Sequence, residues 1–255
     1  MDLAGKDFWE GFWHRQDARR FAGLSHFQHR MTGLLLKYVA PGTSVCEIGC
    51  GGSTWMPLLA QRGADVWGID YSDAGIALAR RNLDRLGTAA TLVQADVRDP
   101  HALPAERFDV IFSSGFIEHF DDAARVLTVI AGWLRPSGVI VTLVPNFVGP
   151  WGRLQRRVDP ELFSKHILYT PAALDAIHGD AGLAVREPAA FFGGFGPLVV
   201  NYSRPLGAAP PFARTAFVGA MWGGQQLVAW TLSTLGEGDA RLYSSHVAGV
   251  YGVRR

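Results

Sequence analysis

The sequence predicts an α/β protein with a doubly wound sheet, and two observations lead to this fold class. Strand-like and helix-like segments alternate from residue 43 to residue 146. The expected strands are nearly continuous apolar runs, such as TSVCEIG at 43–49 and VIVTLVPN at 139–146. Such runs are typical of parallel strands that helices cover on both faces, and ligands then bind at the carboxyl ends of the strands.

The alternation predicts five strands first and two more after Asn146. The first five are expected at 43–49, 64–70, 90–96, 107–114 and 139–146. Helices are expected between them at 51–63, 72–87 and 121–138, with Ser53 and either Ser72 or Asp73 as N-caps. Further along, the pattern predicts a helix at 171–179, a sixth strand at 183–193 and a last strand at 244–255.

Two segments lie outside this alternation. Residues 1–40 carry two apolar helical patterns and predict an N-terminal helical cap, so that 41–255 form the main domain. The uncharged stretch 215–236 lies in a helical insertion expected at about 192–243. It is long enough to span a bilayer, but GGQQ at 223–226 favours a helix that lines the pocket, packs on the sheet or pairs in a homodimer. Attachment to a membrane surface stays open.

Composition limits the class of partner and the compartment. Of the 255 residues, 48% are hydrophobic and 18% charged, and the formal net charge is +1, which predicts a globular chain without the basic footprint of a nucleic-acid partner. Cys46 and Cys50 are too few for a disulfide scaffold or a structural zinc site. The charged N-terminus is not a secretory signal, and we expect a cytoplasmic protein.

A glycine-rich turn and three carboxylates indicate the ligand. VCEIGCGG at 45–52 joins a strand to a helix, where glycines let the backbone approach a ligand. Asp70 ends the second strand, where it could accept both hydroxyls of a ribose, and Asp96 ends the third. With Glu47 these acids would repel a pyrophosphate, whereas they complement a sulfonium and an ammonium. Thr54 also stands where a dinucleotide fingerprint requires its third glycine.

Five segments in this order resemble the class I, S-adenosylmethionine-dependent methyltransferases with a seven-stranded Rossmann-like sheet. They are EIGCGG at 47–52, GIDYS at 68–72, QADV at 94–97, FDVIFSSGFIEHF at 108–120 and LRPSGV at 134–139. The resemblance implies that the glycine turn holds the methionine part, Asp70 the ribose and Asp96 the adenine side, with Tyr71 beside the adenosine. The cofactor-binding residues expected on this basis are Trp9, Glu47, Gly49, Cys50, Gly51, Asp70, Tyr71, Ala95, Asp96, Val97, Ser113 and Ser114.

The segment after the fourth strand separates subfamilies. Enzymes that methylate amines of nucleic-acid bases carry Asn/Asp-Pro-Pro-Tyr/Phe there, whereas residues 113–116 read SSGF. Some quinone-type and small-RNA methyltransferases carry a metal-binding Glu-x-x-Glu-His. This chain keeps Glu118-His119 but has Gly115 in place of the first glutamate, so no metal is expected.

Histidines are the candidates for a base or for a group that orients the acceptor, because a free imidazole titrates near neutral pH. His119 follows the fourth strand and His166 lies in the segment after the fifth; His14 is a third candidate. The alternative is that His119 bonds Glu118 or backbone groups and that His166 lies in a surface loop. Similarly, the aromatic run FWEGFW at 8–13, including Trp9, could form a lid over the cofactor or bury its rings as an amphipathic helix.

The function expected from these observations is methyl transfer from S-adenosylmethionine to a small molecule, with S-adenosylhomocysteine as the second product. A hydroxyl of a secondary metabolite or sugar is the favoured acceptor. Two alternatives remain open at this point: an NAD(P)-type oxidoreductase, and a module that binds S-adenosylmethionine without turnover.

Overall fold

The computed structural model describes residues 2–16, 25–207, 209–235 and 239–254. Part of the expected cap at 1–40 and parts of the expected insertion at 192–243, including Gly236, therefore lie outside the described residues. Seven strands form one sheet in the order β3-β2-β1-β4-β5-β7-β6. The strands are β1 (Ser44–Ile48), β2 (Asp65–Asp70), β3 (Thr91–Gln94), β4 (Phe108–Ser114), β5 (Leu134–Pro145), β6 (Leu183–Phe195) and β7 (Ser244–Val253).

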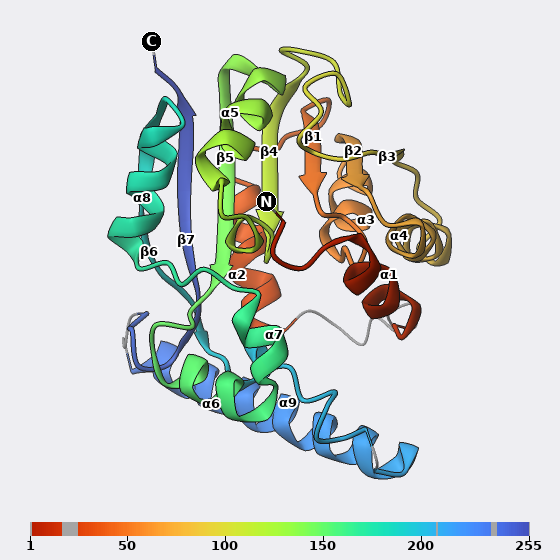
Figure 1. Ribbon diagram of the computed structural model, residues 1–255, viewed down its shortest axis with the longest axis vertical. Coiled ribbons are helices and arrows are strands. Elements are labelled where there is room, and N and C mark those ends of the chain that lie inside the picture. Colours follow the sequence, from red (N-terminus) through yellow and green to blue (C-terminus); the bar gives the residue numbers. More distant parts are fainter. Residues whose placement is uncertain (1, 17–24, 208, 236–238, 255) are drawn as a thin grey trace.

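The pairing of the strands confirms the doubly wound α/β fold. Strands β1 to β5 pair in parallel with their neighbours, and β7 inserts antiparallel between β5 and β6. The order reverses between β1 and β4, which is where ligands bind in open α/β sheets. The carboxyl ends of β1, β2 and β4 meet at that edge, which is the lower one in Figure 1.

Helices cover both faces of the sheet. The helices are α1 (Lys6–His14), α2 (His26–Leu35), α3 (Trp55–Ala60), α4 (Asp73–Arg85), α5 (Ala123–Trp133), α6 (Pro150–Val158), α7 (Pro160–Ser164), α8 (Pro171–Asp180) and α9 (Pro211–Thr234), with short 3-10 turns at Ile117–His119 and Pro197–Val199. One core contains α5 and α8; the other contains α2, α3 and α4. Neighbouring residues of one strand alternate between them: Val110 packs with the second core and Ile111 with the first.

Capping side chains and prolines determine where several helices begin and end. The Ser72 hydroxyl accepts a hydrogen bond from Gly75 N–H and caps α4 as expected. Helix α5 ends at Trp133, five residues earlier than expected, because Pro136 cannot continue a helix and β5 already begins at Leu134. The sequence pattern did not indicate α6 and α7, which are short.

The segments outside the alternation have different roles. In the expected cap, α2 packs its Met31 and Leu35 side chains, both fully buried, into the core beside the sheet. In contrast, α1 buries none of its residues and lies across the carboxyl edge, near α4 (Figure 1). Helix α9 lies beyond the same edge, together with α6 and α7 (Figure 1). Within the described residues, no helix combines the length and the apolarity that crossing a bilayer requires.

Candidate active site

A cavity opens at the carboxyl edge of the sheet, and five segments of the chain line it. Its floor comes from the ends of β1 and β2, one wall from the segment after β3, another from the segment after β4, and its roof from the N-terminal segment. The lining residues are Asp2, Trp9, Trp13, Ile48, Gly49, Ile69, Asp70, Tyr71, Ala95, Asp96, Val97, Arg98, Gly115, Phe116, His119 and Phe120. We call it the first cavity.

Glycines shape the turn between β1 and α3. Gly49 has a φ of 70°, a left-handed conformation that side chains rarely allow, and a Cβ there would lie 2.8 Å from the Phe116 ring. A Cβ on Gly51 would lie 2.8 Å from the Trp13 indole and 2.9 Å from the Gly75 Cα. The turn therefore depends on glycine at both positions.

Asp70 is fixed at the end of β2 by two backbone groups. Its Oδ2 accepts a hydrogen bond from Gly51 N–H at 3.0 Å, and its Oδ1 accepts one from Ser72 N–H at 2.9 Å. The residue is 7% exposed, and burial raises the pKa of its carboxyl to about 6, so most of it is ionised at pH 7. Each carboxylate oxygen has a further lone pair, so Asp70 can still accept two hydroxyl hydrogens.

The rim of the first cavity is less acidic than the sequence suggested. The Arg98 guanidinium pairs with Asp96, with Nη2 2.5 Å from Oδ2 and Nε 3.0 Å from Oδ1, and holds the pKa of that carboxyl below its usual value. Glu47 borders a different cavity, where it accepts a hydrogen bond from the Ser53 hydroxyl. In contrast to Asp96, Asp70 therefore pairs with backbone groups rather than with a cation.

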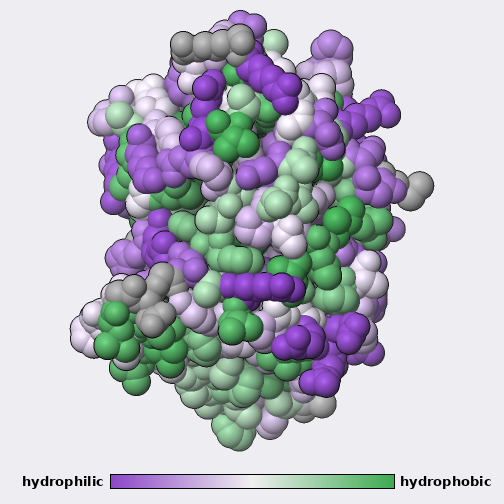
Figure 2. Space-filling model, turned by 90° about the vertical axis from the view of Figure 1, so that its left-hand side faces the viewer, coloured by the Kyte–Doolittle hydropathy of each residue, from purple (hydrophilic) through white to green (hydrophobic). Residues whose placement is uncertain are grey.

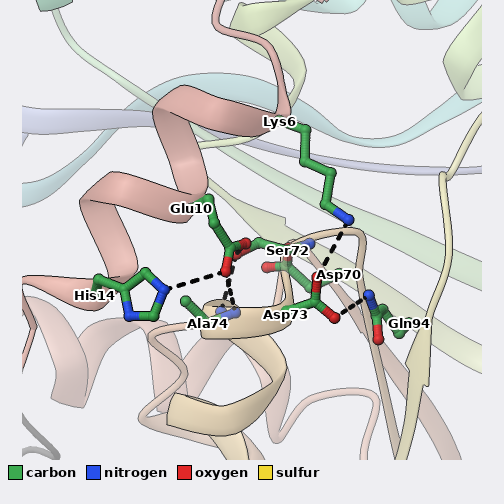
Figure 3. A network of polar contacts seen from close by, with 9 residues as sticks. Lys6, Glu10, His14, Asp70, Ser72, Asp73, Ala74 and Gln94 are labelled. Carbon is green, nitrogen blue, oxygen red and sulfur yellow. Dashed lines mark hydrogen bonds and ion pairs between the residues drawn. The ribbon is translucent and has the colours of Figure 1, made fainter.

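The N-terminal segment closes over the first cavity. Leu3 N–H donates to the His119 carbonyl at 2.8 Å, and the Tyr71 hydroxyl donates to the Asp2 carboxylate at 2.5 Å. Figure 3 shows the next attachment: Glu10 of α1 points to the start of α4 and accepts hydrogen bonds from the Ser72 hydroxyl at 2.6 Å and from Ala74 N–H at 2.9 Å. A carboxylate at a helix N-terminus is stabilised there.

This attachment places two indoles of α1 in the roof. The Trp13 ring lies over the glycine turn, so close that a Cβ on Gly52 would be 2.7 Å away. The Trp9 ring meets the His119 ring edge-on, with centroids 4.9 Å apart. These contacts are compatible with both predictions for α1, a lid over the cofactor and an aromatic helix that only covers the domain.

A second, larger opening lies on the other side of the glycine turn. Its aromatic lining comes from Phe12, Trp13, Phe27, Trp55 and Trp222, and its polar lining includes Glu47, Ser114, Gln225, Ser245 and His246. This second cavity shares Trp13, Gly49 and Gly115 with the first. The two cavities therefore meet at the ends of β1 and β4.

Two buried residues, Glu118 and His119, form a cluster with the half-buried His166 beside the first cavity. His119 Nδ1 lies 2.8 Å from the Lys165 carbonyl and His166 Nδ1 lies 2.7 Å from the Leu162 carbonyl. Only a protonated nitrogen can donate to a carbonyl, so in both neutral rings Nε2 carries the lone pair. Burial lowers the pKa of His119 to about 3 and that of His166 to about 4, and both rings are neutral at pH 7.

The same cluster is the place where this site could hold a metal. Glu118 is 1% exposed and its carboxyl oxygens have no hydrogen-bond partner; burial raises the pKa of this carboxyl to about 8. Ligand atoms of the three residues lie within 4.8 Å of one another. Two imidazole lone pairs and a carboxyl suit a divalent cation, whereas a protonated Glu118 suits none. The expectation that no metal binds stays a prediction.

Comparison with known proteins now identifies the domain. A family model described as a methyltransferase domain matches residues 46–142. Residues 46–142 therefore resemble a methyltransferase domain, and the fold around them is that of S-adenosylmethionine-dependent methyltransferases.

Relatives and solved structures agree with this assignment. A ubiquinone biosynthesis O-methyltransferase of Stutzerimonas stutzeri is 33% identical over 156 residues, which are 57% of this chain and 66% of the relative. One of Aeromonas salmonicida is 29% identical, over 57% of this chain and 65% of the relative. The chain thus spans slightly less than two thirds of both. A SAM-dependent methyltransferase of Archaeoglobus fulgidus shares the fold, with a TM-score of 0.58 and 18% identity. The superposition covers 87% of this chain and 90% of that one.

The structure places the expected cofactor residues in three groups. Those that line the first cavity are Trp9, Gly49, Asp70, Tyr71, Ala95, Asp96 and Val97. Glu47 and Ser114 border the second cavity. Cys50, Gly51 and Ser113 border neither: the Cys50 side chain is in the core and its N–H bonds the Ile69 carbonyl, whereas Gly51 lies beneath Trp13.

The three expected histidines lie in different places. His119 lines the first cavity, and the His166 ring packs against the His119 ring, with centroids 4.5 Å apart. The side chain of His14 is 70% exposed and pairs with Glu10. Sequence reasoning missed Trp13 as a separate contact, and it missed His246, which stacks on Phe27 at 4.1 Å in the second cavity. His246 lies in a strand whose pattern gave no sign of a ligand.

Substitution of Glu10, which attaches α1 to α4, tests whether α1 acts as a lid over the first cavity. We expect Glu10→Ala to weaken S-adenosylmethionine binding by about three- to tenfold, because two charge-assisted hydrogen bonds to α4 are lost. Calorimetry measures the Kd, and thermal unfolding should change little since α1 has no buried residue. Asp7→Ala, an exposed acid of the same helix, is the matched control. An unchanged Kd with a lower Tm would show that α1 serves stability only.

Proposed function

We propose that the protein transfers a methyl group from S-adenosylmethionine to a hydroxyl of a small molecule. The observation that carries this proposal is the meeting of two cavities at Gly49 and Gly115. A methyl donor in the first cavity and an acceptor in the second would face each other there. Methyl transfer needs such alignment more than it needs any single catalytic group.

The first cavity fits the proposed donor. Asp70 would accept the ribose hydroxyls, Tyr71 and the Ala95–Val97 segment would enclose the adenine, and the methionine part would lie beside Gly49. When bound, S-adenosylmethionine supplies the methyl group, and S-adenosylhomocysteine is what remains. Trp9 and Trp13 exclude water from above.

His119 would orient the acceptor. Its Nε2 lone pair is fixed by the Nδ1 hydrogen bond to Lys165, and it can accept the hydrogen of a hydroxyl group near Gly115. His166 is a positioning residue, since it packs against the His119 ring. The hydroxyl proton leaves as the oxygen–carbon bond forms, through this contact or to solvent.

The aromatic lining of the second cavity favours a ring-bearing or otherwise apolar acceptor. Phe27, Trp55 and Trp222 can pack on such a molecule, while Gln225 and His246 offer polar partners. The relatives, which are named for O-methylation in ubiquinone biosynthesis, support a hydroxyl as the acceptor group. Phenols and catechols therefore belong in an assay panel beside sugars and amines.

The orienting role predicts a kinetic effect. His119→Asn and His166→Asn are expected to lower kcat at least tenfold and to leave the Kd of S-adenosylhomocysteine within about twofold, since each loses transition-state interactions worth about 1.4 kcal/mol or more. His101→Asn, an exposed histidine, is the control. A normal kcat in both variants would exclude this orienting role of His119. A lower kcat in His246→Asn alone would instead assign the role to His246 in the second cavity.

The proposal as a whole is tested by binding and by turnover. Calorimetric titration should show one site for S-adenosylmethionine and for S-adenosylhomocysteine and none for NAD. NAD binding instead would favour an oxidoreductase. Transfer of labelled methyl groups to a member of the panel would demonstrate catalysis, whereas tight cofactor binding with no transfer to any member would favour a module without turnover.

A further inference from the structure

Helix α9 is the most exposed apolar element of the described chain. It covers Pro211–Thr234, and of these residues only Gln225 and Ala229 are buried. Leu227 and Trp230 are 66% and 65% exposed, and Phe212 is 77% exposed. Arg214 is the single charged residue of the helix. Isolated apolar side chains on a surface are ordinary, but a whole helix of them marks an interaction site.

The apolar residues cover a broad arc of α9 rather than a narrow stripe. At about 100° per residue, Phe212, Leu227 and Trp230 lie within about 60° of one another, and Phe217, Val228 and Leu235 point about 100° further round. Figure 2 shows the corresponding end of the molecule, at the bottom of the view, as a largely hydrophobic surface with hydrophilic groups beside it.

Basic residues lie at the same end of the molecule. Arg153, Arg156 and Arg157 are exposed and share one side of α6, which lies with α9 beyond the carboxyl edge (Figure 1). The neighbouring exposed arginines are Arg204, Arg214 and Arg241. Two of the nearby acids already have cationic partners: Asp239 pairs with Arg30 at 2.6 Å and Asp159 lies 3.9 Å from Arg204.

We propose that α9 and the arginines of α6 dock on the surface of an anionic lipid bilayer, with α9 lying in the plane of the interface. A broad apolar arc suits immersion among acyl chains, Trp and Phe are favoured at that depth, and arginines attract anionic headgroups. A second copy of the chain fits less well, because a twofold contact over this face would bring the same arginines together.

Docking in this way would place the second cavity at the membrane. Trp222 and Gln225 of α9 border that cavity, so an apolar acceptor could enter it from the bilayer. This consequence rests on the proposed function, whereas docking itself does not. Vesicle binding without cofactor or acceptor therefore tests the docking separately.

Sedimentation with lipid vesicles provides the test. The full chain should bind vesicles in which one third of the phosphatidylcholine is replaced by phosphatidylglycerol, and should bind pure phosphatidylcholine vesicles at least tenfold more weakly. Leu227→Ser combined with Trp230→Ser should reduce binding at least tenfold. Arg156→Gln combined with Arg157→Gln should reduce it several-fold and remove much of its salt dependence. Val185→Ser, at a 45% exposed position near the other end of the sheet, should bind as the wild type does.

Sedimentation velocity of the same proteins completes the test. A wild-type protein that ignores anionic vesicles and sediments as a dimer, which Leu227→Ser with Trp230→Ser makes monomeric, would overturn the proposal in favour of self-association. A wild-type monomer that ignores the vesicles would also overturn it. Circular dichroism confirms that each variant is folded.

Discussion

Asp70→Asn is expected to weaken the binding of S-adenosylmethionine and S-adenosylhomocysteine at least a hundredfold. A hydrogen bond to a charged group contributes about 1.5–3 kcal/mol, and Asp70 would make two of them to a ribose. Every 1.4 kcal/mol is about a tenfold change in affinity. The asparagine also replaces one acceptor by a donor, so the N–H groups of Gly51 and Ser72 cannot both keep their partner.

Calorimetry measures this effect, and two controls define it. Asp84→Asn replaces an exposed carboxylate in α4 and should leave the Kd unchanged. Thermal unfolding of Asp70→Asn separates lost contacts from a lost fold. Because burial raises the pKa of Asp70 to about 6, binding to the wild type should also weaken as the pH falls below about 6. A Kd for Asp70→Asn within threefold of the wild type would contradict the role of Asp70.

The second large effect concerns stability at Glu118. Burial raises the pKa of its carboxyl to about 8 from an ordinary value of 4.5, so the folded chain holds this proton while the unfolded chain releases it. The free energy of unfolding therefore falls as the pH rises from about 4.5 to 8, at about 1.4 kcal/mol per pH unit. Glu118→Gln cannot ionise, and relative to the wild type it should gain up to about 4 kcal/mol between pH 5 and pH 8.

Urea unfolding at pH 5 and pH 8 measures that gain. Glu161→Gln, an exposed position in α7, should show no such difference. The result also decides between a protonated carboxyl and a metal ligand. If a divalent cation binds Glu118, His119 and His166, Glu118→Gln would destabilise the protein at both pH values, and a chelator would do the same to the wild type.

Sequence reasoning predicted the sheet well because buried parallel strands leave an unmistakable pattern. The apolar runs at 43–49 and 139–146 both form strands, as predicted, and Asp70 lies at the end of β2. These features depend on burial and on turn chemistry, which neighbouring residues determine. Helix α5 ended early because Pro136 outweighed its apolar periodicity.

Side-chain rotamers and contacts between distant segments could not be predicted from the sequence. The local pairing of Asp96 with Arg98 depends on a rotamer, and it reduces the acidity on which the choice of cofactor partly depended. Trp13 reaches the glycine turn because α1 is attached to α4, through Glu10 and through the ion pair of Lys6 with Asp73. His246 enters the second cavity through the antiparallel insertion of β7, which no local pattern announces.

A crystal structure with S-adenosylhomocysteine tests the central claim most directly. The ribose hydroxyls should lie within 3.2 Å of the Asp70 carboxylate, and the sulfur should lie beside Gly49 and Gly115, at the opening to the second cavity. A ribose that makes no contact with Asp70, or a ligand bound away from the glycine turn, would contradict the assignment of the two cavities.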